Sequence, residues 1–119
     1  MRTPWGASDH QQEYGEGVTF YGTPSHGGFK LSADRNAEVQ SSLRDDNGWY
    51  EEDVEWACVC FTFPELFVNV EDVEMATVEL AKAYAAERLL NWMPDEYELA
   101  TGIPIEPGQS YMRDKHLFY

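Results

Sequence analysis

The sequence predicts an α+β fold, in which a short antiparallel meander packs against three or four helices in a single domain, residues 1–119. Two observations favour this class: short apolar runs between glycine-rich turns fill the first third of the chain, and helical periodicity follows. A length of 119 residues suits one domain, and no repeat or low-complexity segment suggests a second. We expect a meander over about 12–31, a helical part over about 33–101 and an extended tail over 102–119.

Three strands make up the expected meander. Gln12–Tyr14 and Val18–Tyr21 flank Gly15-Glu16-Gly17, where glycine tolerates the positive φ of a hairpin turn. Thr23–Gly28 forms a second turn, and Phe29–Leu31 follows as the third strand.

Two helices are expected next. Ser32 suits the N-cap of a helix over Ala33–Leu43, which the turn-forming Asp45–Gly48 segment ends. Trp49–Asp53 opens the second helix, and a strand over Ala57–Phe63 is the alternative because its residue types suit a sheet. The helical interpretation rests on apolar residues at helical spacing, namely Val54, Ala57, Cys58 and Phe61.

The clearest predicted element is a helix over about Val70–Met93, with Asn69 as its N-cap. The stripe expected to face the core consists of Val73, Ala76, Thr77, Leu80, Ala83 and Tyr84. A short helix over Asp95–Thr101 follows, with Gly102 past its end. Ser110–Tyr119 forms a last helical turn or a docked tail.

The net charge of −14 is the most informative feature for function. Asp45–Glu106 carries sixteen acidic and two basic residues, which accounts for the whole charge, and no lysine or arginine lies between Arg44 and Lys82. Such a segment repels nucleic acid and anionic membranes and attracts proteins that bind nucleic acid. Because 14% of the residues are aromatic, the chain is not a disordered acidic tail.

Clustered carboxylates are the candidate partner-binding residues. The clusters Glu51–Glu55 and Glu71–Glu74 also fall at predicted helix N-termini, where negative side chains stabilise a helix. The helix dipole accounts for only part of the excess, which leaves a partner-binding surface and a solubility device as alternatives. The predicted partner-binding residues are Asp45, Asp46, Glu51, Glu52, Asp53, Glu55, Glu71, Asp72, Glu74, Glu79, Asp95, Glu96 and Glu98.

Several segments taken together resemble a known family. They are Thr3-Pro4-Trp5-Gly6, Thr23–Ser32, Arg35-Asn36, Trp49–Asp53, Glu55-Trp56-Ala57 and Phe63–Phe67. In this order they resemble a small domain of unknown function found in proteins of bacterial plasmids, integrated elements and phages, over about the first two thirds of the chain. The resemblance implies a mobile-element context, in which small acidic proteins are often counter-defence factors. The family has no established activity, so no catalytic residue is carried over.

The expected function is counter-defence of the anti-CRISPR or antirestriction type. The partner is then a host defence protein or complex with a basic nucleic-acid-binding groove, which the acidic surface occupies in place of phosphates. We expect a monomer or homodimer in the cytoplasm of a bacterial host, with no direct nucleic-acid or membrane contact, no enzymatic activity and no cofactor. No metal site is expected either, because His10, His26 and His116 lack ligand spacing and the cysteine pair Cys58 and Cys60 is interpreted as two small buried hydrophobes.

A small enzyme or ligand-binding domain centred on His26 and Glu51–Asp53 is the alternative. Ser25-His26-Gly27-Gly28 is the most enzyme-like segment, since histidine can serve as acid or base and Glu52 or Asp53 could orient it. A hairpin turn whose histidine caps a backbone group or pairs with a carboxylate explains the same segment. An accessory protein of conjugation or phage replication is a third candidate.

Overall fold

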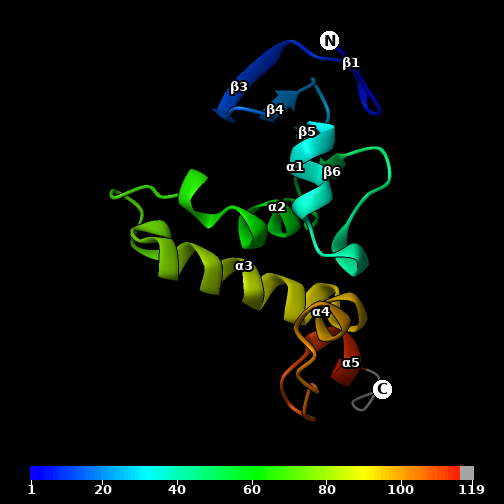
Figure 1. Cartoon of the computed structure of the whole chain (residues 1–119), viewed down its shortest axis with the longest axis vertical. Coiled ribbons are helices and arrows are strands. Elements are labelled where there is room, and N and C mark those ends of the chain that lie inside the picture. The colour runs from blue at the N-terminus through cyan, green and yellow to red at the C-terminus, as the bar shows by residue number, and fades with distance from the viewer. Residues whose placement is uncertain (116–119) are drawn as a thin grey trace.

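A computed structural model describes residues 1–115 and places the strands in two antiparallel sheets at one end of the molecule (Figure 1). The smaller sheet is a two-stranded hairpin, and the larger has the strand order β3-β4-β5-β6. The strands are β1 (Arg2–Thr3), β2 (Gly6–Ala7), β3 (His10–Gly15), β4 (Val18–Gly22), β5 (Gly27–Leu31) and β6 (Trp49–Glu51). The meander is therefore confirmed, with β6 as an additional edge strand.

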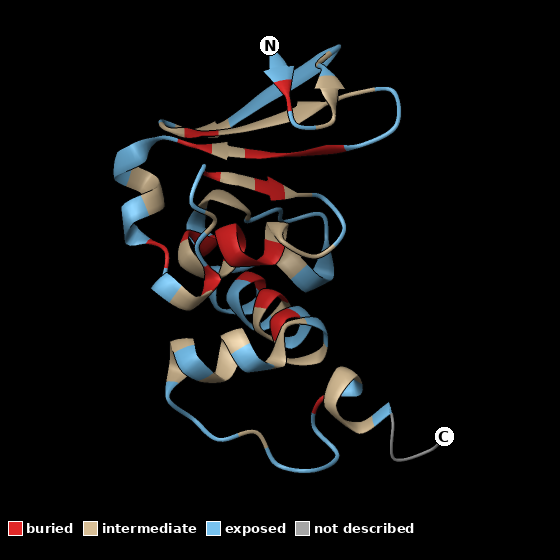
Figure 2. Ribbon diagram, turned by 90° about the vertical axis from the view of Figure 1, so that its right-hand side faces the viewer, coloured by how far each residue is buried: buried red, intermediate tan, exposed pale blue. Residues whose placement is uncertain are grey.

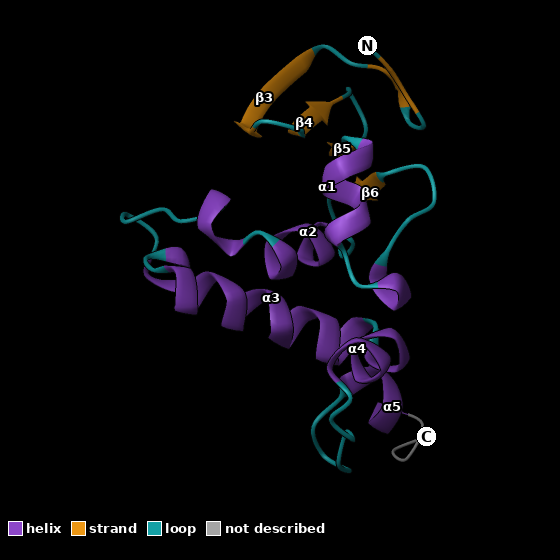
Figure 3. Ribbon diagram, viewed as in Figure 1, coloured by secondary structure: helices purple, strands orange, loops and turns teal. Residues whose placement is uncertain are grey.

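Helix α1 lies beside β5 and β6, the other α-helices follow beneath the larger sheet, and the described chain runs from the sheet end to the opposite end of the longest axis (Figures 1 and 3). The α-helices are α1 (Ala33–Glu38), α2 (Trp56–Thr62), α3 (Val78–Trp92), α4 (Pro94–Thr101) and α5 (Tyr111–Asp114). Single 3₁₀ turns lie at η1 (Ser41–Leu43), η2 (Pro64–Leu66) and η3 (Val73–Met75). The predicted α+β class is confirmed. No helix of the described chain has the length and apolarity that a bilayer span requires.

The hydrophobic core lies between the sheet and α2 and continues between α2 and α3 (Figure 2). On the sheet, the register places Phe20 opposite Phe29 and Phe29 opposite Tyr50, so one row of rings crosses three strands. Residues 57–60 of α2 are fully buried, and Cys60 Sγ lies 3.5 Å from the carbonyl oxygen of Ala81 in α3. Close packing of the two helices is possible because their facing side chains are small.

The prediction that Trp49–Asp53 opens a helix is wrong, because Trp49–Glu51 is strand β6. The Tyr50 hydroxyl donates to Asn36 Oδ1 and accepts from the Asp45 backbone N–H at 3.0 Å, which holds this strand against α1. Burial of this ring raises the pKa of Tyr50 to about 12. Residues 56–62 do form the predicted helix, so the alternative of a strand there is wrong.

Helix α3 begins eight residues later than predicted. Thr77, not Asn69, is its N-cap, and its hydroxyl accepts from the Leu80 N–H at 3.1 Å. Residues 69–75 instead form turns in which the side chains of Asn69 and Asp72 accept from nearby backbone N–H groups, a common competitor of helix. The predicted stripe is also wrong in phase: Ala81, Ala85 and Leu89 face the core, while Leu80 is 46% exposed.

Other helix boundaries agree better with the sequence. Ser32 caps α1 as predicted, but the helix expected over Ala33–Leu43 stops at Glu38 and resumes only as the turn η1. Helix α4 is confirmed, and Gly102 follows it with a φ of 72°, the left-handed conformation that favours glycine. The predicted last helical turn is α5; residues 116–119, including His116, lie outside the described residues.

Candidate functional site

Two of the predicted partner-binding carboxylates cap local turns. Asp45 Oδ2 accepts from the backbone N–H groups of Asn47 and Trp49, both at 3.0 Å. Asp72 Oδ1 accepts from the Glu74 N–H at 3.0 Å and caps η3. These side chains shape the backbone, as aspartate commonly does in turns.

Glu51 and Glu55 form a reciprocal cap of the turn that precedes α2, whose first helical residue is Trp56. The Glu51 carboxylate accepts from the backbone N–H groups of Asp53, Val54 and Glu55 at 2.6–2.9 Å, and Glu55 Oε1 accepts from the Glu51 N–H at 3.1 Å. Partial burial acts to raise the pKa of Glu51, but these three N–H donors, with a small contribution from nearby His26, lower it below the ordinary value. Glu51 is therefore committed to the fold.

Replacing Glu51 with glutamine is expected to lower the free energy of unfolding at pH 7 by about 0.5–1 kcal/mol, the lower part of the range for capping side chains because solvent screens this half-exposed group. A carboxylate with a lowered pKa stabilises the fold above its unfolded pKa, and this contribution is lost as the pH falls through the folded pKa. Urea unfolding at pH 7 and pH 3 should therefore show the wild type and Glu51→Gln converging in acid.

The control is Glu52→Gln, the adjacent exposed carboxylate, which makes no hydrogen bond through its side chain to another residue in 1–115 and should change stability little. Equal losses for both variants, or a Glu51→Gln loss that persists at pH 3, would contradict the capping role.

Arg113 neutralises two further predicted residues. Its guanidinium lies 2.8 Å from Asp95 Oδ1 and 3.0 Å from Glu98 Oε1, and both ion pairs connect α5 to α4. Arg113, together with the Ile105 backbone N–H, lowers the pKa of Glu98. These carboxylates are occupied by their own chain.

The remaining predicted carboxylates have no ion-pair partner among residues 1–115. Glu96 is half-buried, and the exposed ones are Asp46, Glu52, Asp53, Glu71, Glu74 and Glu79. The nearby cations are occupied differently: Arg35 and Arg44 donate to backbone carbonyls, while Lys82 and Arg88 lie over the rings of Phe61 and Tyr84. Arg88 is attracted by Glu74 without forming an ion pair, so the exposed negative charge is largely, but not wholly, uncompensated within the described chain.

The predicted carboxylates do not form one compact patch. Glu71, Asp72, Glu74 and Glu79 lie at the N-terminal end of α3, whereas Asp95, Glu96 and Glu98 lie on α4 beyond its C-terminal end. Fifteen helical residues separate these ends by about 22 Å. We call residues 70–80 the α3 tip; it also exposes Val70, Val73, Val78 and Leu80.

His26 lies in the turn between β4 and β5, exposed to solvent. Its backbone N–H donates to Thr23 Oγ1 at 3.0 Å, and its carbonyl accepts from the same hydroxyl at 2.6 Å. This geometry is a hairpin turn closed by threonine. Strand β5 begins at Gly27, so the turn is shorter than the predicted Thr23–Gly28.

A shallow hollow of about 320 Å³ lies where the sheet meets α2 and η2. Its wall is largely aromatic, and one carboxylate lies at its edge. The lining residues are His10, Gln12, Tyr14, Phe20, Phe29, Glu52, Trp56 and Phe67. We call it the aromatic hollow. It includes Glu52 from the alternative site but not His26.

A second hollow of about 430 Å³ adjoins the aromatic hollow, since Gln12, Tyr14 and Phe67 line both. It runs past Glu13 to Asp72 and Met75, at the base of the α3 tip. The two hollows therefore connect the aromatic wall with the acidic tip.

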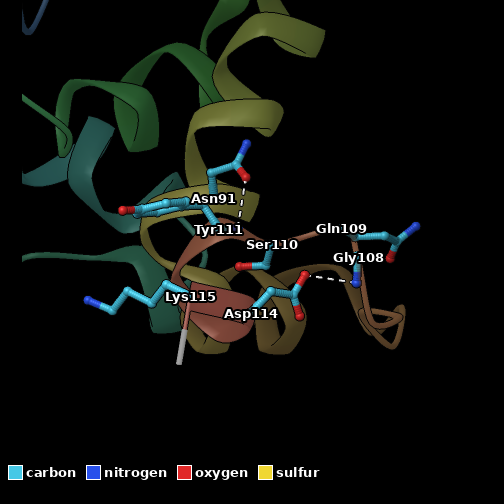
Figure 4. A pocket seen from close by; sticks show the side chains of 7 residues that line it. All are labelled: Asn91, Gly108, Gln109, Ser110, Tyr111, Asp114 and Lys115. Carbon is cyan, nitrogen blue, oxygen red and sulfur yellow. Dashed lines mark hydrogen bonds between the residues drawn. The ribbon is translucent and has the colours of Figure 1, made fainter. Parts of the chain in front are cut away.

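A third hollow, of about 530 Å³, lies between the end of α3 and α5 (Figure 4). Its polar groups serve the fold: the Tyr111 N–H donates to Asn91 Oδ1 at 3.0 Å, and the Gly108 N–H donates to Asp114 Oδ2 at 2.8 Å. Lys115, which lines it, is the last described residue. These two hydrogen bonds occupy polar groups of Asn91, Gly108, Tyr111 and Asp114.

The two cysteines, Cys58 and Cys60, are in surroundings that make their thiols unreactive. Both are fully buried in α2, and burial raises the pKa of each thiol to about 12, so neither is a ready nucleophile. No group of three or more histidine, cysteine or acidic residues within 1–115 could hold a metal ion.

The aromatic hollow was not predicted from the sequence. Strand β3 starts at His10, two residues before the predicted strand, and alternation places His10 and Gln12 on one face, while Tyr14 lies at the register irregularity between Glu13 and Gly15. That alternation is the sequence pattern from which this side of the hollow could have been predicted. The contribution of Trp56 and Phe67 from the helical part depends on tertiary packing and has no sequence signal.

Comparison with known proteins identifies one family. Its model, described as a domain of unknown function (DUF7007), matches residues 1–119. No curated protein and no solved structure matches the chain. The protein therefore belongs to the DUF7007 family of domains of unknown function.

Proposed function

We propose that this protein is a counter-defence factor of the anti-CRISPR or antirestriction type, which binds a host nucleic-acid-binding complex and occludes its basic groove. The mobile-element setting, the cytoplasm of a bacterial host and a non-enzymatic mechanism belong to the same proposal. The observation that carries it is the uncompensated negative charge of a chain with a net charge of −14, exposed most clearly at the α3 tip.

The α3 tip combines charge with exposed apolar surface. Val70 is 81% exposed and Val73 is 80% exposed, beside the exposed carboxylates of Glu71, Glu74 and Glu79. Folding alone does not account for this pairing, since like charges repel and exposed valines gain nothing from burial. A cationic groove with apolar edges would satisfy both features.

Occlusion by charge has a kinetic signature. Long-range attraction speeds association with a basic groove and weakens as salt screens it, while apolar contacts persist. Affinity for the partner should therefore fall steeply between 50 and 500 mM salt, mainly through the association rate.

The test is displacement of labelled DNA from a panel of purified host complexes, including a CRISPR surveillance complex and a restriction enzyme. The variant Glu71→Lys/Glu74→Lys/Glu79→Lys should weaken displacement by on the order of 100-fold, because close charge pairs at interfaces couple strongly. Asp9→Lys/Glu16→Lys/Glu38→Lys changes the net charge equally at exposed positions outside the acidic half and should have a much smaller effect.

Equal losses for the two triple variants would show that only overall charge matters and would reject the α3 tip as the docking surface. Absence of displacement by the wild type across the panel would reject the proposed function.

A ligand-binding domain remains the second candidate, and one observation favours it. Glu52 lines the aromatic hollow, whose volume of about 320 Å³ lies at the lower end of small-ligand sites. His26 and Asp53 do not line it, so this candidate depends on Glu52 rather than on a histidine acid–base pair.

A further inference from the structure

We propose that the aromatic hollow binds the guanidinium group of an arginine side chain, supplied by the basic surface of the partner. This inference deepens the proposed function, on which the identity of the arginine's owner rests. The recognition of guanidinium itself depends only on the residues of the hollow.

The wall of the hollow is a continuous series of rings. Phe29 contacts three neighbours, with centroid distances of 5.3 Å to Phe20, 4.9 Å to Tyr14 and 5.3 Å to Phe67. Trp56 extends the series at 6.4 Å from Phe67. Phe29 is buried and forms the floor, while the others are half-buried and present part of their surface to solvent. Ring faces attract cations, and they attract arginine more often than lysine.

Gly27 brings the carboxylate to this wall. A Cβ atom at Gly27 would lie 2.7 Å from Phe20 Cζ and 3.1 Å from Glu52 Oε2, so both groups occupy the space that a side chain would fill. The Glu52 backbone N–H also donates to the Gly27 carbonyl at 3.0 Å, which fixes the start of the β6–α2 turn. The Glu52 carboxylate, a hydrogen-bond acceptor, is thereby placed beside the aromatic rings that line the hollow.

Charge complementarity selects a cation as the occupant. Among the described residues that line the hollow there is no lysine or arginine, and the Glu52 carboxylate makes no hydrogen bond within 1–115. The adjoining hollow adds Glu13 and Asp72 along the path to the α3 tip. A basic segment could thus place one side chain among the rings and others against the tip.

Arginine fits better than lysine for a geometric reason. The planar guanidinium can stack on a ring and at the same time donate two hydrogen bonds to one carboxylate, whereas an ammonium group is a compact point charge. We therefore expect selectivity for the planar cation and not merely for positive charge.

The experiment is an NMR titration of the intact protein with Nα-acetyl-arginine amide, followed at the Trp56 indole N–H and the His10 ring. Nα-acetyl-citrulline amide is the neutral near-isostere, and Nα-acetyl-lysine amide tests the shape of the cation. Arginine should shift these resonances at millimolar concentration with saturation, lysine should bind more weakly, and citrulline should leave them unchanged.

Matched variants separate the hollow from general attraction to an acidic protein. Glu52→Gln and Asp53→Asn each remove one charge from adjacent exposed positions, but only Glu52 lines the hollow. We expect about a tenfold loss of arginine affinity for Glu52→Gln and less than a twofold loss for Asp53→Asn. Trp56→Leu should lose about fivefold, while Trp92→Leu, at a 41% exposed position outside the hollow, should lose none.

Equal binding of arginine and citrulline, or equal losses for Glu52→Gln and Asp53→Asn in proteins whose spectra remain folded, would overturn the inference. Arginine binding without displacement of DNA from any host complex would retain the guanidinium site and reject the proposed function. Displacement that depends on the α3 tip but is unaffected by Glu52→Gln would retain the proposed function and reject the hollow as the site that binds the partner's arginine.

Discussion

Gly28→Ala is expected to destabilise this protein by about 3 kcal/mol or more, enough to lower its Tm by roughly 12 °C. A Cβ atom at Gly28 would lie 2.5 Å from the Tyr50 carbonyl oxygen and 2.7 Å from Trp5 Cζ3. The first of these atoms belongs to the paired backbone of β6 and cannot rotate away. The strain could therefore be relieved only by moving the paired backbone of β6, which costs stability.

The position matters because two layers meet on Gly28. Trp5, in the turn between β1 and β2, lies over Gly28, and its ring meets that of Trp49 edge to face at a centroid distance of 5.7 Å. Tyr21 and Lys30 complete this outer cluster around Trp49. The absent side chain allows the N-terminal hairpin to cover the outer face of the sheet.

Thermal unfolding followed by circular dichroism measures the loss, with Gly22→Ala as the matched control. Gly22 lies on the neighbouring strand, and a Cβ there would meet no atom closer than 3.6 Å, so its variant should lose less than about 1 kcal/mol. Adding Trp5→Ala to Gly28→Ala should recover only part of the loss, since the Tyr50 carbonyl remains. Similar stability of the two glycine variants would show that neither Trp5 nor the Tyr50 carbonyl crowds Gly28.

The contact between Trp5 and Gly28 shows which parts of the fold the sequence could predict. The Thr3–Gly6 and Thr23–Gly28 segments stand out as motifs, but nothing in the sequence indicates that Trp5 rests on Gly28. Alternation and glycine turns predict strands because those signals are local. Which faces meet is decided by tertiary packing, which local patterns do not encode.

The acidic residues illustrate the same limit at the candidate site. Composition predicts an excess of carboxylates, yet the role of each depends on which donor comes near it. Glu51 meets three backbone N–H groups and Glu98 meets Arg113, while Glu52, one position from Glu51, faces the aromatic hollow. Neighbouring glutamates thus have different roles, and only the three-dimensional structure distinguishes them.

The error in α3 has a comparable cause. A helix drawn from Val70 gives a stripe through Leu80 and Tyr84, but capping by Thr77 starts the helix later and packing against α2 selects Ala81, Ala85 and Leu89. The small alanines permit the close approach of α2, which raw hydrophobicity does not reveal. When apolar residues lie on two faces of a predicted helix, their spacing indicates that a helix forms but does not indicate which face is buried.

Leu89→Ala is accordingly expected to lower the free energy of unfolding by about 2–5 kcal/mol, whereas Leu80→Ala should cost less than about 1 kcal/mol. Leu89 is fully buried between α3 and its neighbours, so truncation removes apolar contacts and leaves a cavity. Leu80 is 46% exposed, and alanine favours a helix, which offsets the small loss of contact.

The two substitutions make the same chemical change on the same helix, nine residues apart, so urea unfolding compares the two faces directly. Their midpoints should differ clearly, with similar m-values if both proteins unfold in two states. Equal losses would place both leucines in comparable surroundings and contradict the helix phase. A greater loss at Leu80 would restore the stripe expected from the sequence and turn Ala81, Ala85 and Leu89 outward, because one straight helix cannot bury both faces equally against α2.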